Sequence, residues 1–164
     1  MKQYWLIGMY LSAIVVANLM VATFGASVTI ISAFLFIGLD ITARDQLHDT
    51  WQGRKLWVKM FILIAVGSFI SWILNRDAHL IAIASCIAFI ISGLGDLLMY
   101  QVLHKKSWYI RVNGSNMISA AIDSIVFPWI AFGYPVWWIV LGQFSAKVFG
   151  GAVWAWIIKR LNLK

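Results

Sequence analysis

Apolar segments long enough to cross a lipid bilayer follow one another along most of this chain. Six of them can be drawn, at residues 4–24, 27–43, 56–74, 80–100, 109–132 and 136–158. A membrane-spanning helix needs roughly 20 such residues. The second segment is therefore barely long enough to cross the membrane, whereas the other five have sufficient length. The sequence therefore predicts an all-α fold, a polytopic bundle of six transmembrane helices in one domain over residues 1–164, with five helices as the alternative count.

The composition excludes a soluble protein. Hydrophobic residues make up 62% of the chain, charged residues only 12%, and the mean hydropathy is +0.85. The formal net charge of +7 would suggest a nucleic-acid partner if the basic residues formed one face. They lie instead between the apolar segments, so we expect membrane lipid around the protein and no nucleic acid.

The basic residues sort to one side of the six segments. Cytoplasmic loops of membrane proteins carry an excess of Lys and Arg. An inside N-terminus places eleven of them on the inner side: Lys2, Arg44, Arg54, Lys55, Lys59, Lys105, Lys106, Arg111, Lys159, Arg160 and Lys164. The outer side receives only Arg76, and Lys147 lies within a segment. This sorting predicts a multi-pass protein of the cytoplasmic (inner) membrane with both termini in the cytoplasm.

The fifth segment carries polar residues that are expensive to place in hydrocarbon. Helical spacing puts Asn113, Asn116, Ala120, Asp123 and Phe127 on one narrow face. Two amides, a small residue, a carboxylate and an aromatic ring on one stripe are typical of a pocket wall.

A membrane-embedded lysine should have a carboxylate partner. At about 1.5 Å per residue, Asp123 lies ~16 Å and Lys147 ~20 Å from the connection between the last two segments, so they share nearly one depth. Asp123 is the first candidate partner and Asp40, ~20 Å from the outer end of the second segment, is the second. Gln143 lies one turn from Lys147 and could complete the network.

Three further polar residues lie within other segments. Asp40 and Arg44 are four residues apart and could pair along their own helix, in competition with an Asp40–Lys147 pair. Asp96 follows two glycines that would let a helix or a flat ligand approach closely. Asn18 lies in the outer half of the first segment. Each residue alone could serve helix packing, but polar groups from five helices indicate a binding site.

Other chemistries are not supported by the sequence. The three histidines lie in loops at different membrane faces, so we expect no metal site, and no cofactor motif is found. No ATP-binding loop or nucleophile elbow occurs, so we expect no enzyme. Most Trp residues lie near segment ends as an interfacial belt, whereas Trp129 is deeper and could face a ligand. The segment from Asp40 to Lys59 suggests an amphipathic stretch at the inner interface.

Several short motifs form a series along the chain. They are Ala17-Asn18-Leu19; Asp40-Ile41-Thr42-Ala43-Arg44; Gly95-Asp96-Leu97; Arg111, Ser115-Asn116, Asp123-Ser124, Phe127 and Ala131-Phe132; and Phe144 to Val148. This series resembles the bacterial queuosine-precursor transporters, the YhhQ-like or vitamin uptake transporter family. The chain departs from that family in its short length and in Asp45-Gln46-Leu47, where the family has a Glu-Val-Tyr-Gly variant.

The resemblance implies a fold similar to the substrate-binding components of energy-coupling-factor transporters. It also implies uptake of 7-cyano-7-deazaguanine or 7-aminomethyl-7-deazaguanine. Asp96 or Asp123 would accept the hydrogen bonds of the guanine-like edge, Asn18 and Asn116 would orient it, and Phe127 or Trp129 would stack on the ring. Lys147 would neutralise a carboxylate, Asp40 and Gln143 would complete the substrate-binding set, and Arg44 and Arg111 would form structural ion pairs.

Two other functions fit the same residues. The chain could be a vitamin or nucleobase carrier that works with separate ATP-hydrolysing subunits. It could also assemble as a homo-oligomer. It could also be a non-transporting membrane scaffold in which the polar residues only pack helices.

Overall fold

The described part of the chain, residues 2–51 and 55–162 of a computed structural model, is built from helices and contains no strand. The long helices are α1 (Lys2–Phe24), α4 (Leu56–Leu74), α5 (His79–Val102), α6 (Trp108–Phe132) and α7 (Trp137–Asn162). A sixth rod is formed by α2 (Thr29–Ser32), the π-helical turn η2 (Ala33–Ile37) and α3 (Gly38–Trp51), which follow one another without a gap. Six rods therefore correspond to the six apolar segments.

Three tight connections join the rods at one end of the bundle. Gly25 has φ 72° and leads into the short helix η1 (Ala26–Val28). Asn75 accepts a hydrogen bond from the backbone N–H of Asp77 as the short helix η3 (Arg76–Ala78) begins. Gly133 ends α6 with φ 81°, a left-handed conformation that glycine adopts without a Cβ clash. Glycine or asparagine thus marks each of these turns in the sequence, at 24–26, 75–77 and 133–135.

The second rod is longer than its apolar segment. It continues through the charged residues to Trp51, rather than ending near residue 43. Leu47 is fully buried and packs with Tyr10 of α1 and Met60 of α4 in the apolar core. The expectation that 40–59 lies as one amphipathic stretch at the membrane interface is therefore wrong for its first part, because Ala43 and Leu47 face the core.

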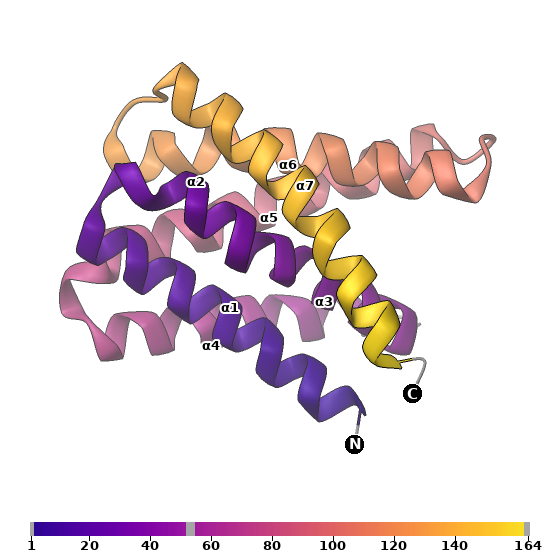
Figure 1. Ribbon diagram of the computed structural model, residues 1–164, viewed down its shortest axis with the longest axis horizontal. Helices are drawn as coiled ribbons and strands as arrows, with labels where there is room; N and C mark the ends of the chain where they lie inside the picture. The colour runs from indigo at the N-terminus through magenta and orange to yellow at the C-terminus, as the bar shows by residue number, and fades with distance from the viewer. Residues whose placement is uncertain (1, 52–54, 163–164) are drawn as a thin grey trace.

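The rods pack so that α3 reaches the centre of the bundle. Helix α1 lies against α3 and α4, α3 lies against α7, and α5 pairs along its length with α6. Figure 1 shows the beginning of α1 and the end of α7 at the same end of the bundle. It also shows the connection between α5 and α6, in salmon, extending away from the ends of α3 and α7.

Glycines allow the closest crossing in the bundle. A Cβ atom at Gly38 would lie 2.6 Å from the carbonyl carbon of Gly150, and one at Gly150 would collide with the carbonyl oxygen of Phe34. Thr42 then donates across this crossing to the carbonyl oxygen of Gly151 at 3.1 Å. Of the Gly150–Gly151 pair, Gly150 therefore has the close-packing role. The crossing brings α3 and α7 backbone to backbone beside Asp40 and Lys147.

Within the described residues, four helices are long and apolar enough to cross a membrane: Gln3–Phe24, Ala26–Leu47, Arg76–Val102 and Asn113–Phe132. Val58–Leu74 is apolar but shorter. Helix α7 has sufficient length, yet Gln143 and Lys147 interrupt its apolar character. Large apolar side chains such as Phe61, Leu98 and Leu141 point outward and are more than half exposed. A surface of this kind is what a helical bundle presents to lipid.

Candidate functional site

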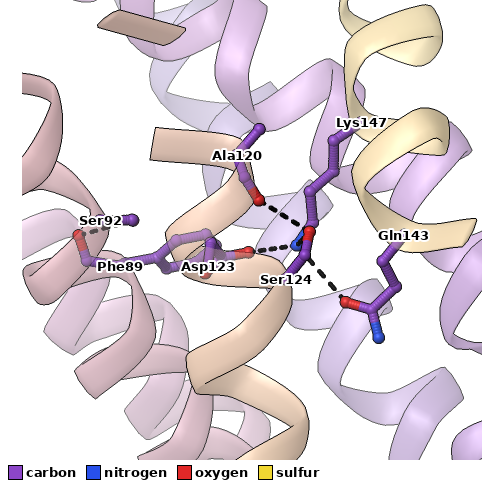
Figure 2. A network of polar contacts seen from close by, with 7 residues as sticks. All are labelled: Phe89, Ser92, Ala120, Asp123, Ser124, Gln143 and Lys147. Atoms are coloured by element: carbon purple, nitrogen blue, oxygen red, sulfur yellow. Dashed lines mark hydrogen bonds and ion pairs between the residues drawn. The ribbon is translucent and has the colours of Figure 1, made fainter. Parts of the chain in front are cut away.

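A buried ion pair between α6 and α7 lies at the centre of the bundle. The Nζ atom of Lys147 donates hydrogen bonds to Asp123 Oδ2 at 2.5 Å, to Ser124 Oγ at 2.9 Å and to Gln143 Oε1 at 3.4 Å. The side chains of Lys147 and Asp123 are only 2% and 10% exposed. Figure 2 shows the two side chains pointing toward one another. The expected pairing of Lys147 with Asp123, and the participation of Gln143, are confirmed.

Local sequence explains why this network forms. Asp123 and Ser124 are adjacent on α6, and the Ser124 hydroxyl is held by its own bond to the Ala120 carbonyl at 2.7 Å. Gln143 and Lys147 are four residues apart on α7, so they share one helix face. An ammonium group has three N–H donors, and here all three are used. The charge of Lys147 is therefore compensated inside the membrane region.

A small cavity lies on one side of this ion pair, toward the tight turns. Its volume is about 30 Å³, and Asn18, Asp123, Phe127, Gln143 and Lys147 contribute to its wall. The Nε2 atom of Gln143 is buried there without a hydrogen-bond partner. A cavity of this size holds one or two water molecules but no heterocycle. We call it the outer cavity.

A much larger cavity lies on the other side of the ion pair, between α3, α6 and α7. Its volume is about 410 Å³, and its wall includes Thr42, Asp45, Asn113, Asn116 and Lys147. Asn113 is exposed, so the cavity is accessible from outside the bundle. We call it the inner cavity. Because Lys147 borders both cavities, the Lys147–Asp123 pair lies at the boundary between them.

The polar stripe of α6 lines both cavities, from the exposed Asn113 to the buried Asp123. Asn113, Asn116 and Ala120 line the inner cavity, whereas Asp123 and Phe127 line the outer cavity. The predicted pocket wall is thus present, but it serves two cavities rather than one. The sequence could not show this division, because it arises from the lysine that enters from α7.

Charged groups on α3 connect to the inner cavity. Asn116 Nδ2 donates to Asp45 Oδ2 at 3.1 Å, and Asp45 Oδ1 lies 3.8 Å from Arg44 Nε. Arg44 therefore pairs with its neighbour Asp45, and the expected Asp40–Arg44 pair is wrong. The same structure corrects the alternative pairing of Lys147, which bonds to Asp123 and not to Asp40.

Asp96 belongs to a different place in the bundle. It lines a third cavity of about 210 Å³ between α1, α3, α4 and α5, together with Tyr10, Arg44 and Phe89. Its Oδ1 atom is buried without a hydrogen-bond partner. The space next to Gly95 is filled by Ile122 of α6, so that glycine admits a neighbouring helix. Asp96 and Asp123 thus do not share one cavity.

Three other predicted residues have distinct surroundings. Trp129 is 61% exposed on the outside of α6, so the expectation that its ring faces a ligand is wrong. Asn18 is buried and donates to Ser71 Oγ at 3.2 Å, which links α1 to α4. The side chain of Arg111 lies outside the part of the chain that the structure describes, so its predicted ion pair stays a prediction.

The sequence reasoning missed two residues of the network. Ser124 accepts from Lys147, and Asp45 joins Arg44 to Asn116. The signal for Ser124 was its place beside Asp123, and the signal for Asp45 was its place one residue after Arg44. Within residues 2–51 and 55–162 no group of three His, Cys, Asp or Glu side chains is placed to hold a metal ion.

Comparison with known proteins gives one match. Residues 5–160 match the family described as Putative vitamin uptake transporter. The chain belongs to this family. None of the curated proteins and none of the solved structures compared with the chain matches it.

Membership in the vitamin uptake transporter family agrees with the geometry. The match covers nearly the whole chain, from the first turns of α1 to the end of α7. Together with several helices long and apolar enough to cross a membrane, it identifies a multi-pass membrane transporter and indicates a non-enzymatic role. The family part of the resemblance is therefore confirmed.

Proposed function

We propose that this member of the vitamin uptake transporter family imports a queuosine precursor, 7-cyano-7-deazaguanine or 7-aminomethyl-7-deazaguanine, across the cytoplasmic membrane. The observation that carries the proposal is the boundary formed by Lys147 and Asp123 between an outer and an inner cavity. Both cavities are lined by one polar stripe of α6. A stripe of this kind, exposed at Asn113 and buried at Asp123, suits a polar molecule that must pass between the two sides.

The chemistry of the stripe complements a guanine-like edge. Such an edge offers N1–H and an exocyclic amine to a carboxylate, which Asp123 supplies. Its carbonyl accepts from an ammonium or amide group, which Lys147 and Asn116 supply. The ring of Phe127 gives a stacking surface on the same helix face. The substrate would thus exchange its hydrogen bonds for those of the Lys147–Asp123 pair as it passes.

The distribution of basic residues supports the orientation. The inner cavity lies toward the end of the bundle that carries exposed Lys105, Lys106 and Arg160. Cytoplasmic ends carry such residues, so the larger cavity would open to the cytoplasm. In this orientation the protein has six spans and both termini in the cytoplasm. The structure would then correspond to an inward-open state, because the outer cavity is too small to admit a heterocycle.

Uptake rescue tests the proposal. Cells unable to make deazaguanines are supplied with each precursor, and queuosine is measured in their tRNA. The wild-type protein should restore queuosine, and Asp123→Asn should not, because the amide cannot accept both donors or pair with Lys147. Asp77→Asn is the matched control, since Asp77 is an exposed residue of η3 outside the cavities.

Two outcomes would contradict the proposal in different ways. Full rescue by Asp123→Asn at equal protein level would show that the substrate passes elsewhere. Failure of the wild-type protein to rescue with either precursor would reject the substrate. The family description favours a vitamin as the second candidate, so the same uptake assay is then repeated with vitamins and nucleobases. Copurification of ATP-hydrolysing subunits would favour a carrier energised by partners.

A further inference from the structure

Asp40 is a buried acid for which the proposed transport path gives no role. It lies on α3 directly after the π-helical turn η2, at the crossing with α7, and is 1% exposed. Its Oδ1 atom is buried without a hydrogen-bond partner. No ion pair joins it to any residue within 2–51 and 55–162. Turns of this π-helical kind occur frequently at functional sites.

Ionisable groups from three other helices surround Asp40. Asp40 lies between Gly38, whose backbone meets that of Gly150, and Thr42, which donates to the carbonyl oxygen of Gly151, so α7 crosses beside it. Lys147 lies about one helical turn before these two glycines and is bonded to Asp123 of α6, and Tyr10 of α1 also interacts electrostatically with Asp40. The turn η2, which also packs against α3, contains only Ala, Phe, Leu and Ile. Lys147 is thus the cation that approaches Asp40 from another helix, and it is bonded to Asp123.

The cation on the helix of Asp40 is also engaged. Arg44 interacts electrostatically with Asp40, but its ion pair is with Asp45. Asp45 itself is a second carboxylate on the same helix and repels a charge on Asp40. Both cations near Asp40 therefore serve other carboxylates in this state.

An unpaired carboxylate at this depth is unfavourable as an anion, and such a group binds a proton instead. A group of two carboxylic acids and one ammonium has a net charge of about zero only when one of the two acids is protonated. We propose that Asp40, Asp123 and Lys147 form a proton-binding triad in which Asp40 carries an exchangeable proton while Lys147 is bonded to Asp123. The ligand of this site is the proton itself.

The triad links the proton to the substrate, a step that rests on the proposed function. When N–H donors of the substrate bond to Asp123, they displace Lys147. The ammonium group keeps its three protons and moves to Asp40, the other carboxylate within its electrostatic reach. The O–H bond of Asp40 then breaks, the proton passes to solvent, and the resulting carboxylate pairs with Lys147, while the N–H donors of the substrate stabilise the negative charge of Asp123. Substrate binding thus releases about one proton, and affinity rises with pH.

Infrared spectroscopy of the ligand-free protein tests the triad without any substrate. With ¹³C-labelled aspartate, the wild-type protein should show the C=O stretch of a protonated carboxylic acid. Asp40→Asn should lose this band, and Asp77→Asn should keep it. Asn has the shape of a neutral Asp and should preserve the fold. A wild-type spectrum without the band, or a band unchanged in Asp40→Asn, would overturn the proposal.

Calorimetry tests the linkage. Binding of 7-cyano-7-deazaguanine is measured in two buffers of different ionisation enthalpy, and the difference gives the protons released. We expect about one proton for the wild-type protein and none for Asp40→Asn. Wild-type binding without proton release would overturn the linkage. If the infrared band is present and the compound does not bind, the triad stands and the proposed substrate is wrong.

Discussion

The Lys147–Asp123 pair makes the sharpest prediction about stability. Lys147→Met keeps the length of the side chain but removes all three hydrogen bonds of the ammonium group and leaves Asp123 as an unpaired buried carboxylate. Removing one partner of a buried pair costs about 3–5 kcal/mol. Asp123→Asn should cost a similar amount, because Lys147 loses the carboxylate to which it is bonded and regains one only by leaving Ser124 and Gln143 for a deprotonated Asp40.

The double variant separates the pair from its two residues. With both charges removed, no unpaired charge remains, so we expect a total loss of about 3–5 kcal/mol rather than the sum of about 6–10 kcal/mol. The coupling energy should therefore be about 3–5 kcal/mol, at or above the upper end of the range for contacting residues. The assay is equilibrium unfolding by SDS in mixed micelles, followed by the fluorescence of the chain's 10 Trp residues.

Two results would refute this reasoning. If the two losses simply add in the double variant, the charges do not stabilise one another. If the double variant recovers uptake, the pair only fixes the packing of α6 against α7. The account predicts a double variant that is no less stable than either single variant and has no uptake, because it no longer offers a carboxylate to the substrate.

Three further predictions concern packing, the aromatic rings and access. Gly150→Ala should destabilise the bundle by about 1–3 kcal/mol in the same SDS assay, because the added methyl group would collide with backbone atoms. Gly151→Ala should have almost no effect on stability, because the space around Gly151 is open. Equal losses would contradict the close crossing. Phe127→Ala should raise the KM for uptake, whereas Trp129→Ala should leave it unchanged; the reverse order would place the substrate on the outer face of α6. In a variant without the native cysteine, Asn116→Cys should react with an impermeant thiol reagent added from the cytoplasmic side, and reaction only from the other side would contradict the proposed orientation.

Much of the fold could be predicted from the sequence, because apolar runs and turn residues act locally. The glycines and Asn75 mark the turns, and each apolar segment corresponds to a helical rod. The second rod was predicted too short, since hydropathy falls where charged residues begin. Ala43 and Leu47 continue the buried face past that point, and a hydropathy average does not detect a single buried face.

The Lys147–Asp123 contact could be predicted because depth in a membrane follows from the residue count along a helix. Rotation about the helix axis could not be predicted in the same way. Trp129 has the right depth but the wrong face, and Asp96 faces a different cavity from Asp123. The pairing of Arg44 with Asp45 likewise depends on side-chain directions within α3, which the residue count along a helix does not give.

The central claim is that a polar, guanine-like molecule crosses the membrane through the stripe of α6 that holds Asp123. The most direct measurement is uptake of radiolabelled 7-cyano-7-deazaguanine and 7-aminomethyl-7-deazaguanine into proteoliposomes that contain the purified protein. The account predicts saturable uptake of at least one of them by the wild-type protein and by Asp77→Asn, and its loss in Asp123→Asn. Uptake of both no greater than that of empty liposomes, or equal uptake by Asp123→Asn, would contradict it.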